Sequence, residues 1–137
     1  MVFFDTNVLV YVHDQRSAYK REVARRLYSA HLYGGSIALS TQVLQEFFVT
    51  VTQKAQQISI REARGLVSHL AGLNVIRIEP EHVLSAIDLH AKYQLSFWDS
   101  LIIVAAKSAG AQVVLSEDLG HGQIYDGVRV ENPFLTQ

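Results

Sequence analysis

The sequence contains no cysteine, which removes several kinds of chemistry at once. Without thiols the chain cannot form disulfides, bind zinc through thiolates or use a cysteine nucleophile, and nothing indicates an oxidising compartment. No run approaches the roughly 20 uncharged apolar residues that span a bilayer. Residues 1–12 are apolar but carry Asp5 and Asn7 and lack a basic segment, so they do not predict a signal peptide. We therefore expect a soluble, cytoplasmic protein that does not bind membranes.

A strong charge of either sign is missing as well. The formal net charge is −1, so no overall basic field indicates nucleic-acid binding, although a local basic stripe would be enough for it. Neither a GxxxxGKS/T nor a GxGxxG motif is present, which argues against use of a nucleoside triphosphate or a dinucleotide. Apolar residues are plentiful: 49% of the 137 residues are hydrophobic, which predicts one packed domain over residues 1–137.

Short apolar segments alternate along the chain with segments of helical periodicity. Strands are expected at residues 2–4, 36–40, 75–78, 113–116 and 128–130. Between them, the apolar spacing predicts helices beginning near residues 6, 17, 40, 59, 80 and 97. The expected N-caps include Ser17, Ser40 or Thr41, and Ser59. Strands separated by helices predict an α/β fold, with a central parallel sheet of about five short strands flanked by helices.

Ligands of open parallel sheets bind beyond the carboxyl ends of the strands, so acidic residues at these positions are candidate functional groups. Asp5 follows the first strand directly. Asp118, beside Glu117, follows the fourth strand. Asp99 lies in the first turn of the helix predicted from residue 97, and Glu46 lies about two turns into the helix after the second strand. These four acids from distant segments are therefore the candidates for a site at that edge of the sheet.

Each acid alone has an ordinary structural explanation, such as helix capping for Asp5 or a favourable charge at a helix start for Asp99. Both nevertheless lie in apolar sequence, where a carboxylate is costly unless it is paired or bound to metal. No lysine or arginine is near either residue in the sequence, which indicates an ion as the positive partner. Several carboxylate oxygens suit Mg²⁺ or Mn²⁺ rather than zinc. Because such clusters clamp phosphate oxygens and activate water, hydrolysis of a phosphodiester is predicted.

Five stretches resemble PIN-domain ribonucleases, especially the VapC-like toxins of bacterial toxin–antitoxin pairs. They are FFDTNVLVY, STQVLQEFF, SFWDSLIIVAA, VVLSEDLGHG and VENPF, in that family's order and spacing over essentially the whole chain. The resemblance implies a PIN-like fold with the first strand at the centre of the sheet. It also implies a divalent-metal-dependent endoribonuclease that forms a homodimer. A cognate antitoxin would inhibit it by occupying the active-site groove.

The resemblance also assigns roles to individual residues. Four acids match the catalytic quartet that binds Mg²⁺ or Mn²⁺: Asp5, Glu46, Asp99 and Asp118. Three polar residues match the positions that support this quartet: Thr6, Asn7 and Ser116. Glu117, next to the fourth acid, could assist it or replace it. The sequence leaves that choice open, as it does the number of ions and the general base.

A basic segment gives RNA one way to bind. Lys20, Arg21 and Arg25 share part of one face of the helix predicted from residue 17, and a stripe that contacts phosphates is one interpretation. The other interpretation is a solvated helix with an ion pair between Glu22 and Arg26.

Aromatic side chains give RNA a second way to bind, because they stack on unpaired bases. Tyr11, Tyr19 and Trp98 are candidates for this contact. For Trp98 we expect core packing instead, since the helix that contains it is apolar nearly all round.

Other α/β proteins also place an aspartate after their first strand. A phosphatase of the haloacid dehalogenase type needs a second aspartate two residues later, where this sequence has Asn7. A phospho-receiver domain needs an acidic pair before that aspartate and a strand-end lysine after it, and neither is evident. The remaining alternative is a catalytically silent PIN-like module that binds RNA or protein.

Overall fold

The computed structural model describes residues 1–54 and 58–135. Within these residues the strands form one six-stranded sheet in the order β3-β2-β1-β4-β6-β5. The strands are β1 (Val2–Phe4), β2 (Ile37–Ser40), β3 (Asn74–Ile76), β4 (Val113–Leu115), β5 (Ile124–Tyr125) and β6 (Val128–Glu131). All neighbouring strands in this sheet pair in parallel except β5 and β6. The predicted α/β fold with a central, mostly parallel sheet is confirmed, and β1 lies at the centre as expected.

The sixth strand was not predicted. β5 is two residues long and pairs antiparallel with β6. The loop between them consists of Asp126 and Gly127, both with positive φ, which suits a two-residue hairpin. A strand this short shows no apolar pattern, so only the Asp-Gly turn marks it in the sequence.

The helices begin close to the predicted residues. Their bounds are α1 (Thr6–Tyr11), α2 (Ala18–Tyr33), α3 (Thr41–Val49), α4 (Ile60–Ala71), α5 (Pro80–Tyr93) and α6 (Phe97–Ser108), and a π-helical turn, η1 (Thr50–Lys54), continues α3. Ser17, Ser40 and Ser59 are the N-caps of α2, α3 and α4, each accepting a hydrogen bond from a backbone N–H in the first turn. Two strands end sooner than predicted: β3 ends at residue 76 and β4 at 115.

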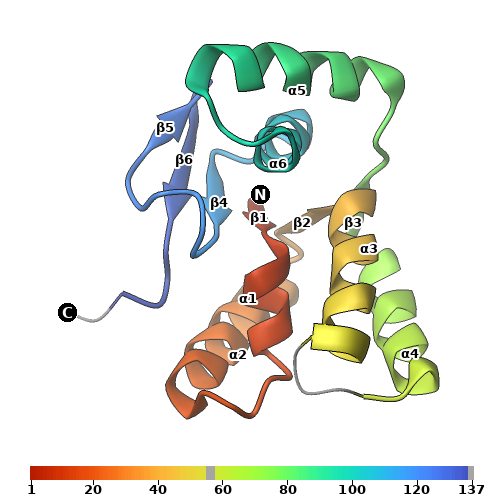
Figure 1. Ribbon diagram of the computed structural model, residues 1–137. Coiled ribbons are helices and arrows are strands. Elements are labelled where there is room, and N and C mark those ends of the chain that lie inside the picture. Colours follow the sequence, from red (N-terminus) through yellow and green to blue (C-terminus); the bar gives the residue numbers. More distant parts are fainter. Residues whose placement is uncertain (55–57, 136–137) are drawn as a thin grey trace.

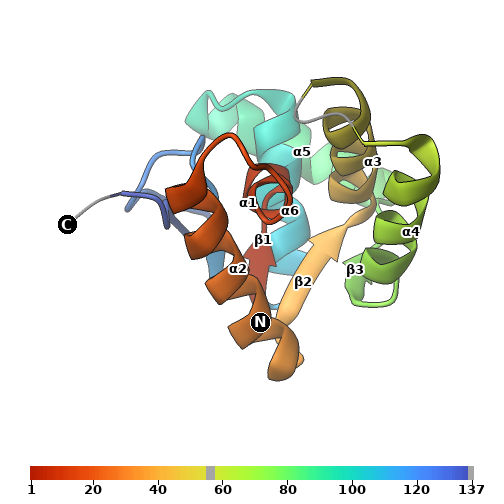
Figure 2. The same ribbon diagram turned by 90° about the horizontal axis from the view of Figure 1, so that it is seen from below.

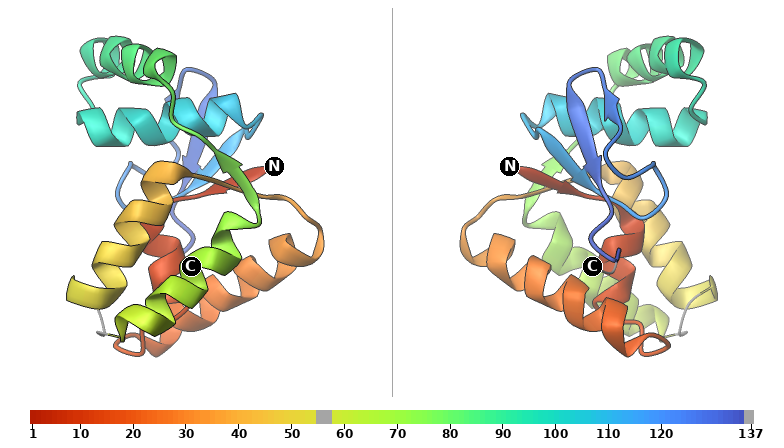
Figure 3. Two further views of the ribbon diagram at one scale, coloured as in Figure 1. Left: turned by 90° about the vertical axis from the view of Figure 1, so that its right-hand side faces the viewer. Right: turned by 90° about the vertical axis from the view of Figure 1, so that its left-hand side faces the viewer.

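The helices lie on both sides of the sheet. α6 packs against β2, β4 and β6, and α5 packs on the outside of α6, at the top of Figure 1. α1 to α4 lie on the opposite side, as the side views in Figure 3 also show. Among these, α1 lies between α2 and α3 (Figure 2). No helix of the described residues is long and apolar enough to cross a membrane.

The core fills the space between the sheet and the two helical layers. Phe3, Phe4 and Val114 of the central strands are fully buried, as are Phe47 of α3 and Ile103 of α6. Full burial of one such side chain stabilises the fold by about 1.5–3 kcal/mol. Because consecutive residues of β1 are buried on opposite faces of the sheet, the strand is a continuous apolar run, typical of a central parallel strand. The residue that follows β1 is therefore held by a rigid frame.

Candidate active site

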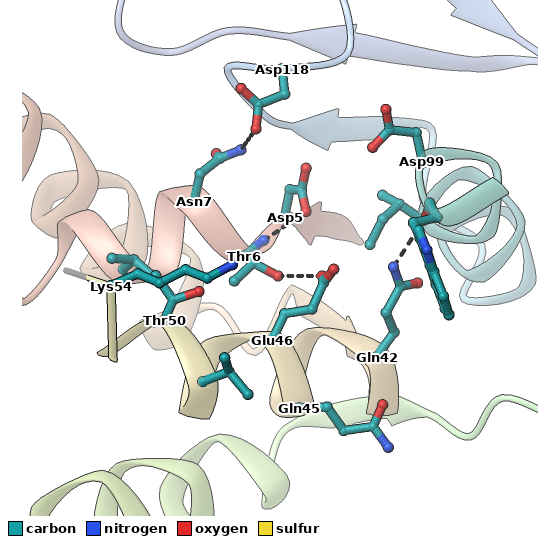
Figure 4. A pocket seen from close by; sticks show the side chains of 14 residues that line it. Asp5, Thr6, Asn7, Gln42, Gln45, Glu46, Thr50, Lys54, Asp99 and Asp118 are labelled. Atoms are coloured by element: carbon teal, nitrogen blue, oxygen red, sulfur yellow. Dashed lines mark hydrogen bonds between the residues drawn. The ribbon is translucent and has the colours of Figure 1, made fainter. Parts of the chain in front are cut away.

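One pocket collects the four predicted acids. It has a volume of about 530 Å³ and is lined by side chains from four separate segments (Figure 4). Asp5 follows β1, Glu46 projects from α3, Asp99 lies in the first turn of α6, and Asp118 follows β4. The topology brings them together because β1 and β4 are neighbours whose carboxyl ends face the same edge of the sheet.

Asp5 is the most enclosed of the four, with 7% of its surface exposed. It is the N-cap of α1, and its Oδ1 accepts a hydrogen bond from the Thr6 backbone N–H at 2.7 Å. Its Oδ2 accepts a hydrogen bond from Ser116 Oγ at 2.7 Å. The register of the sheet explains this contact. Phe4 is paired with Leu115, so the residues that follow the two strands, Asp5 and Ser116, are next to each other.

The pocket is electrostatically unfavourable for its own carboxylates. The pKa of Asp5 is raised from 3.8 to about 6. Burial is the largest cause and the charges of Glu46 and Asp118 add to the rise, while the hydrogen bonds from Ser116 and Thr6 oppose it. Burial also raises the pKa of Asp99, with Asp118 adding to the rise and the hydrogen bond with Ser96 opposing it. A cation within the pocket would relieve this crowding of negative charge.

Three polar residues hold the acids in place. Thr6 Oγ1 donates to Glu46 Oε1 at 2.9 Å, which links α1 to α3. Asn7 Nδ2 donates to Asp118 Oδ2 at 2.9 Å. Ser116 Oγ, which donates to Asp5, also accepts the backbone N–H of Asp118 at 3.1 Å. Each predicted supporting residue thus contacts at least one acid of the quartet.

Glu117 lies outside the pocket, although its neighbour Asp118 lines it. Its Oε1 accepts a hydrogen bond from the Tyr11 hydroxyl at 2.7 Å, and its Oε2 lies 2.9 Å from Lys20 Nζ. The Glu117 backbone N–H donates to Asn7 Oδ1 at 3.3 Å, which helps to fix the turn after β4. Glu117 therefore joins this turn to α1 and α2 instead of adding a fifth carboxylate to the pocket.

The predicted basic stripe on α2 is partly occupied by contacts within the protein. Lys20 pairs with Glu117 and also donates to the Tyr11 hydroxyl at 3.3 Å. Arg25 Nε donates to the Val12 carbonyl at the end of α1, at 2.8 Å. Contact of Lys20, Arg21 or Arg25 with RNA stays a prediction.

Sequence analysis missed the lysine of the pocket. Lys54 lies in η1, nearly 50 residues from Asp5 in the sequence, yet it lines the same pocket (Figure 4). The pattern that could have revealed it is the spacing of Gln42, Glu46, Thr50 and Lys54, which all line the pocket at intervals of four residues. A π turn rotates less per residue than an α turn because its hydrogen bonds run from i to i+5. The turn therefore keeps Lys54 on the face that Glu46 occupies.

The prediction that Trp98 packs in the core is wrong. The residue is 62% exposed and lines the pocket beside Asp99. The buried face of α6 consists of Ser100, Leu101, Ile102, Ile103, Ala105 and Ala106. Trp98 comes two residues before this buried face begins at Ser100, so the apolar composition of the helix did not determine its exposure.

The side chains of the pocket fit a hard divalent cation. Four carboxylates supply oxygen donors, and no histidine lines the pocket. The described residues contain no group of three acidic, histidine or cysteine side chains already placed to enclose an ion. Mg²⁺ does not need such a cage, because it keeps several waters and binds through one or two carboxylates. The volume of the pocket leaves room for those waters. A cation there would favour the ionised form of Asp5, whose pKa is raised by burial and by the charges of Glu46 and Asp118.

Residues 2–126 match the PIN domain family. The chain belongs to this family. The match includes all four acids of the pocket and the polar residues that contact them, so the family resemblance noted in the sequence is confirmed. No curated protein matches the chain.

Solved structures with the same fold include toxins of toxin–antitoxin systems. The toxin VapC20 of Mycobacterium tuberculosis, which cleaves the sarcin–ricin loop, has a TM-score of 0.69 at 16% identity, over 86% of this chain and 90% of that chain. A toxin–antitoxin complex from Klebsiella pneumoniae has a TM-score of 0.72 at 20% identity, over 97% and 98% of the two chains. DNA-bound VapBC from Salmonella typhimurium has a TM-score of 0.68 at 17% identity, over 96% and 97%. At these identities the similarity establishes the PIN fold.

Proposed function

We propose that this PIN-domain protein is a divalent-metal-dependent endoribonuclease and the toxin of a toxin–antitoxin pair. The observation that carries the proposal is the meeting of Asp5, Glu46, Asp99 and Asp118 in one open pocket at the carboxyl ends of the strands. A pocket with four acids and one lysine repels the phosphates of RNA unless a cation is bound. The arrangement therefore favours metal-assisted hydrolysis over metal-free chemistry.

Asp5, Glu46, Asp99 and Asp118 would hold Mg²⁺ or Mn²⁺ in the pocket. When bound, the ion would supply positive charge that holds phosphate oxygens and lowers the pKa of water. Asp5 has the most firmly oriented side chain of the four acids, because the hydrogen bonds from Ser116 and Thr6 hold both of its carboxylate oxygens.

The neighbouring residues position the remaining acids and the substrate. Thr6 orients Glu46, and Asn7 orients Asp118. Lys54 is placed to contact a phosphate of the bound strand, since it is the cation among the described residues lining the pocket. By resemblance to the family, the products would carry a 5′-phosphate and a 3′-hydroxyl.

The proposal also covers partners. Two of the solved structures with this fold are complexes of a toxin with its antitoxin. We extend this to a cognate antitoxin that blocks the pocket, and to a homodimer of the free toxin, as the family resemblance implies.

Incubation of a mixed RNA pool with the purified protein tests the activity. With Mn²⁺ or Mg²⁺ we expect new RNA ends, which sequencing would identify, and with EDTA we expect none. Asp5→Asn and Asp99→Asn should abolish cleavage while the circular dichroism spectrum is preserved. Asp88→Asn is the matched control, because it makes the same change on an exposed residue of α5, outside this pocket.

Wild-type cleavage by either pocket variant would contradict the assignment of that acid. Binding of RNA without metal-dependent cleavage by the wild type would instead favour the catalytically silent module.

A further inference from the structure

Trp98 is an exposed tryptophan at the rim of the acidic pocket. It carries the largest apolar side chain of the sequence, and 62% of its surface is open to solvent. Single exposed aromatics are common on protein surfaces. Tyr33, which is 97% exposed at the end of α2, does not line the pocket. Trp98 differs because it borders the same pocket as the four acids.

The position of Trp98 is fixed by two contacts. Its backbone carbonyl accepts a hydrogen bond from Gln42 Nε2 at 3.1 Å, and Gln42 is itself 5% exposed on α3. Its ring is in edge-to-face contact with the ring of Phe97, with centroids 5.1 Å apart. Gln42 of α3 thus holds the backbone of Trp98 at the rim of the pocket, and Phe97 of α6 supports one edge of its ring.

A rigid indole beside carboxylates suits one part of an RNA chain in particular. Nucleobases stack on aromatic side chains whatever their sequence, because every base has a π-face. Bases within a duplex are already stacked on their neighbours, whereas bases of loops and single strands are free to do this. Asp99 follows Trp98 directly and lines the pocket with it, so a base on the indole would belong to a nucleotide close to the phosphate that is cleaved.

We propose that Trp98 is a substrate-positioning residue that stacks on an unpaired base next to the scissile phosphate. This inference rests on the proposed ribonuclease function and adds to it a residue beside the four acids. Lys54 lies 12 residues after Gln42 along α3 and η1, about 18 Å at the rise of an α-helix. The RNA strand would thus run along α3, with the stacked base near Trp98 and a phosphate near Lys54.

The sequence provides a direct probe, because Trp98 is its one tryptophan. Intrinsic tryptophan fluorescence therefore reports on this residue alone. Stopped-flow mixing of the wild-type protein and Mn²⁺ with a short single-stranded RNA containing all four bases should quench the signal before cleavage. The same strand annealed to its complement should leave the signal nearly unchanged.

Variants separate stacking from a structural role. Trp98→Ala should raise the KM for the single strand between about 5-fold and 150-fold with little change in kcat, since the stacked base is not a reacting group. Trp98→Phe should retain most of the affinity, because it keeps an aromatic face. Tyr33→Ala is the control for removing an exposed aromatic elsewhere. All three should melt close to the wild type, since the truncated rings are largely exposed.

Three results would overturn the inference. They differ in whether the proposed ribonuclease function would be refuted as well. Metal-dependent cleavage without quenching, together with an unchanged KM for Trp98→Ala, would remove the role of Trp98 and leave the ribonuclease function intact. Equal quenching by single strand and duplex would show that the Trp98 ring does not stack on an unpaired base. No binding and no cleavage of RNA by the wild type would remove the proposed function and this inference together, and the exposed indole would then belong to a protein contact.

Discussion

Replacing Asp5 by asparagine should make the metal-free protein more stable at neutral pH. In the folded chain the pKa of Asp5 is about 6, against an ordinary value of 3.8. Between these two values the folded chain keeps a proton that the unfolded chain releases. The free energy of unfolding therefore falls as the pH rises from about 4 to about 6. Above this window the ionised carboxylate of Asp5 costs about 3 kcal/mol relative to a protonated one.

Asparagine avoids this cost but disturbs the local hydrogen bonds. Its side-chain oxygen can still accept the Thr6 backbone N–H. Ser116 Oγ, which donates to Asp5 Oδ2, has to accept from the amide instead, and the rearrangement costs about 1 kcal/mol. The expected net gain at pH 7 is about 2 kcal/mol, which raises Tm by several degrees in a chain of this length. Near pH 4 the gain should disappear, because most of the wild-type carboxyl is then protonated in the folded protein.

Thermal melts followed by circular dichroism, with chelator present and at pH values from 4 to 8, measure this difference. Asp88→Asn is again the control, because its carboxyl is exposed on α5 and the substitution should change Tm little at any pH. A chelated Asp5→Asn protein that melts below the wild type at pH 7 would refute the reasoning. A gain of the same size at pH 4 and pH 7 would also refute it, since ionisation would then not be the cause.

Three further predictions concern cations and RNA. Mn²⁺ should raise the Tm of the wild type more than that of Asp5→Asn, because it binds only the folded form; equal rises in melts of both proteins would mean that Asp5 is not a ligand. Lys54→Ala should raise the KM for RNA and lower the salt slope of binding by about one, whereas Lys54→Arg should preserve both; an unchanged slope would exclude a phosphate contact. Lys20→Ala combined with Arg21→Ala should weaken RNA binding and flatten its salt dependence, and a titration with an unchanged slope would support the solvated-helix interpretation of α2.

Local sequence was sufficient to predict most helices and strands of the fold and to identify the acids of the pocket as candidates. The caps Ser17, Ser40 and Ser59 each bond to a backbone N–H within the next three residues, so their effect does not depend on distant parts of the chain. Asp5 follows a buried strand, and its position at a strand end was visible in the sequence before any contact was known. The rule that open parallel sheets bind ligands at the carboxyl ends of their strands made these acids candidates, and the resemblance to the PIN family implied that they meet.

Only the tertiary structure decided how side chains next to these positions are oriented. Glu117 and Asp118 are adjacent, yet Glu117 binds Lys20 and Tyr11 while Asp118 faces the pocket, because their partners lie roughly 100 residues earlier in the chain. Lys54 is a pocket residue because a π turn continues α3, and Trp98 is exposed because the buried face of α6 begins only at Ser100. Each of these outcomes depends on where a second element lies, whereas composition and periodicity describe one element at a time.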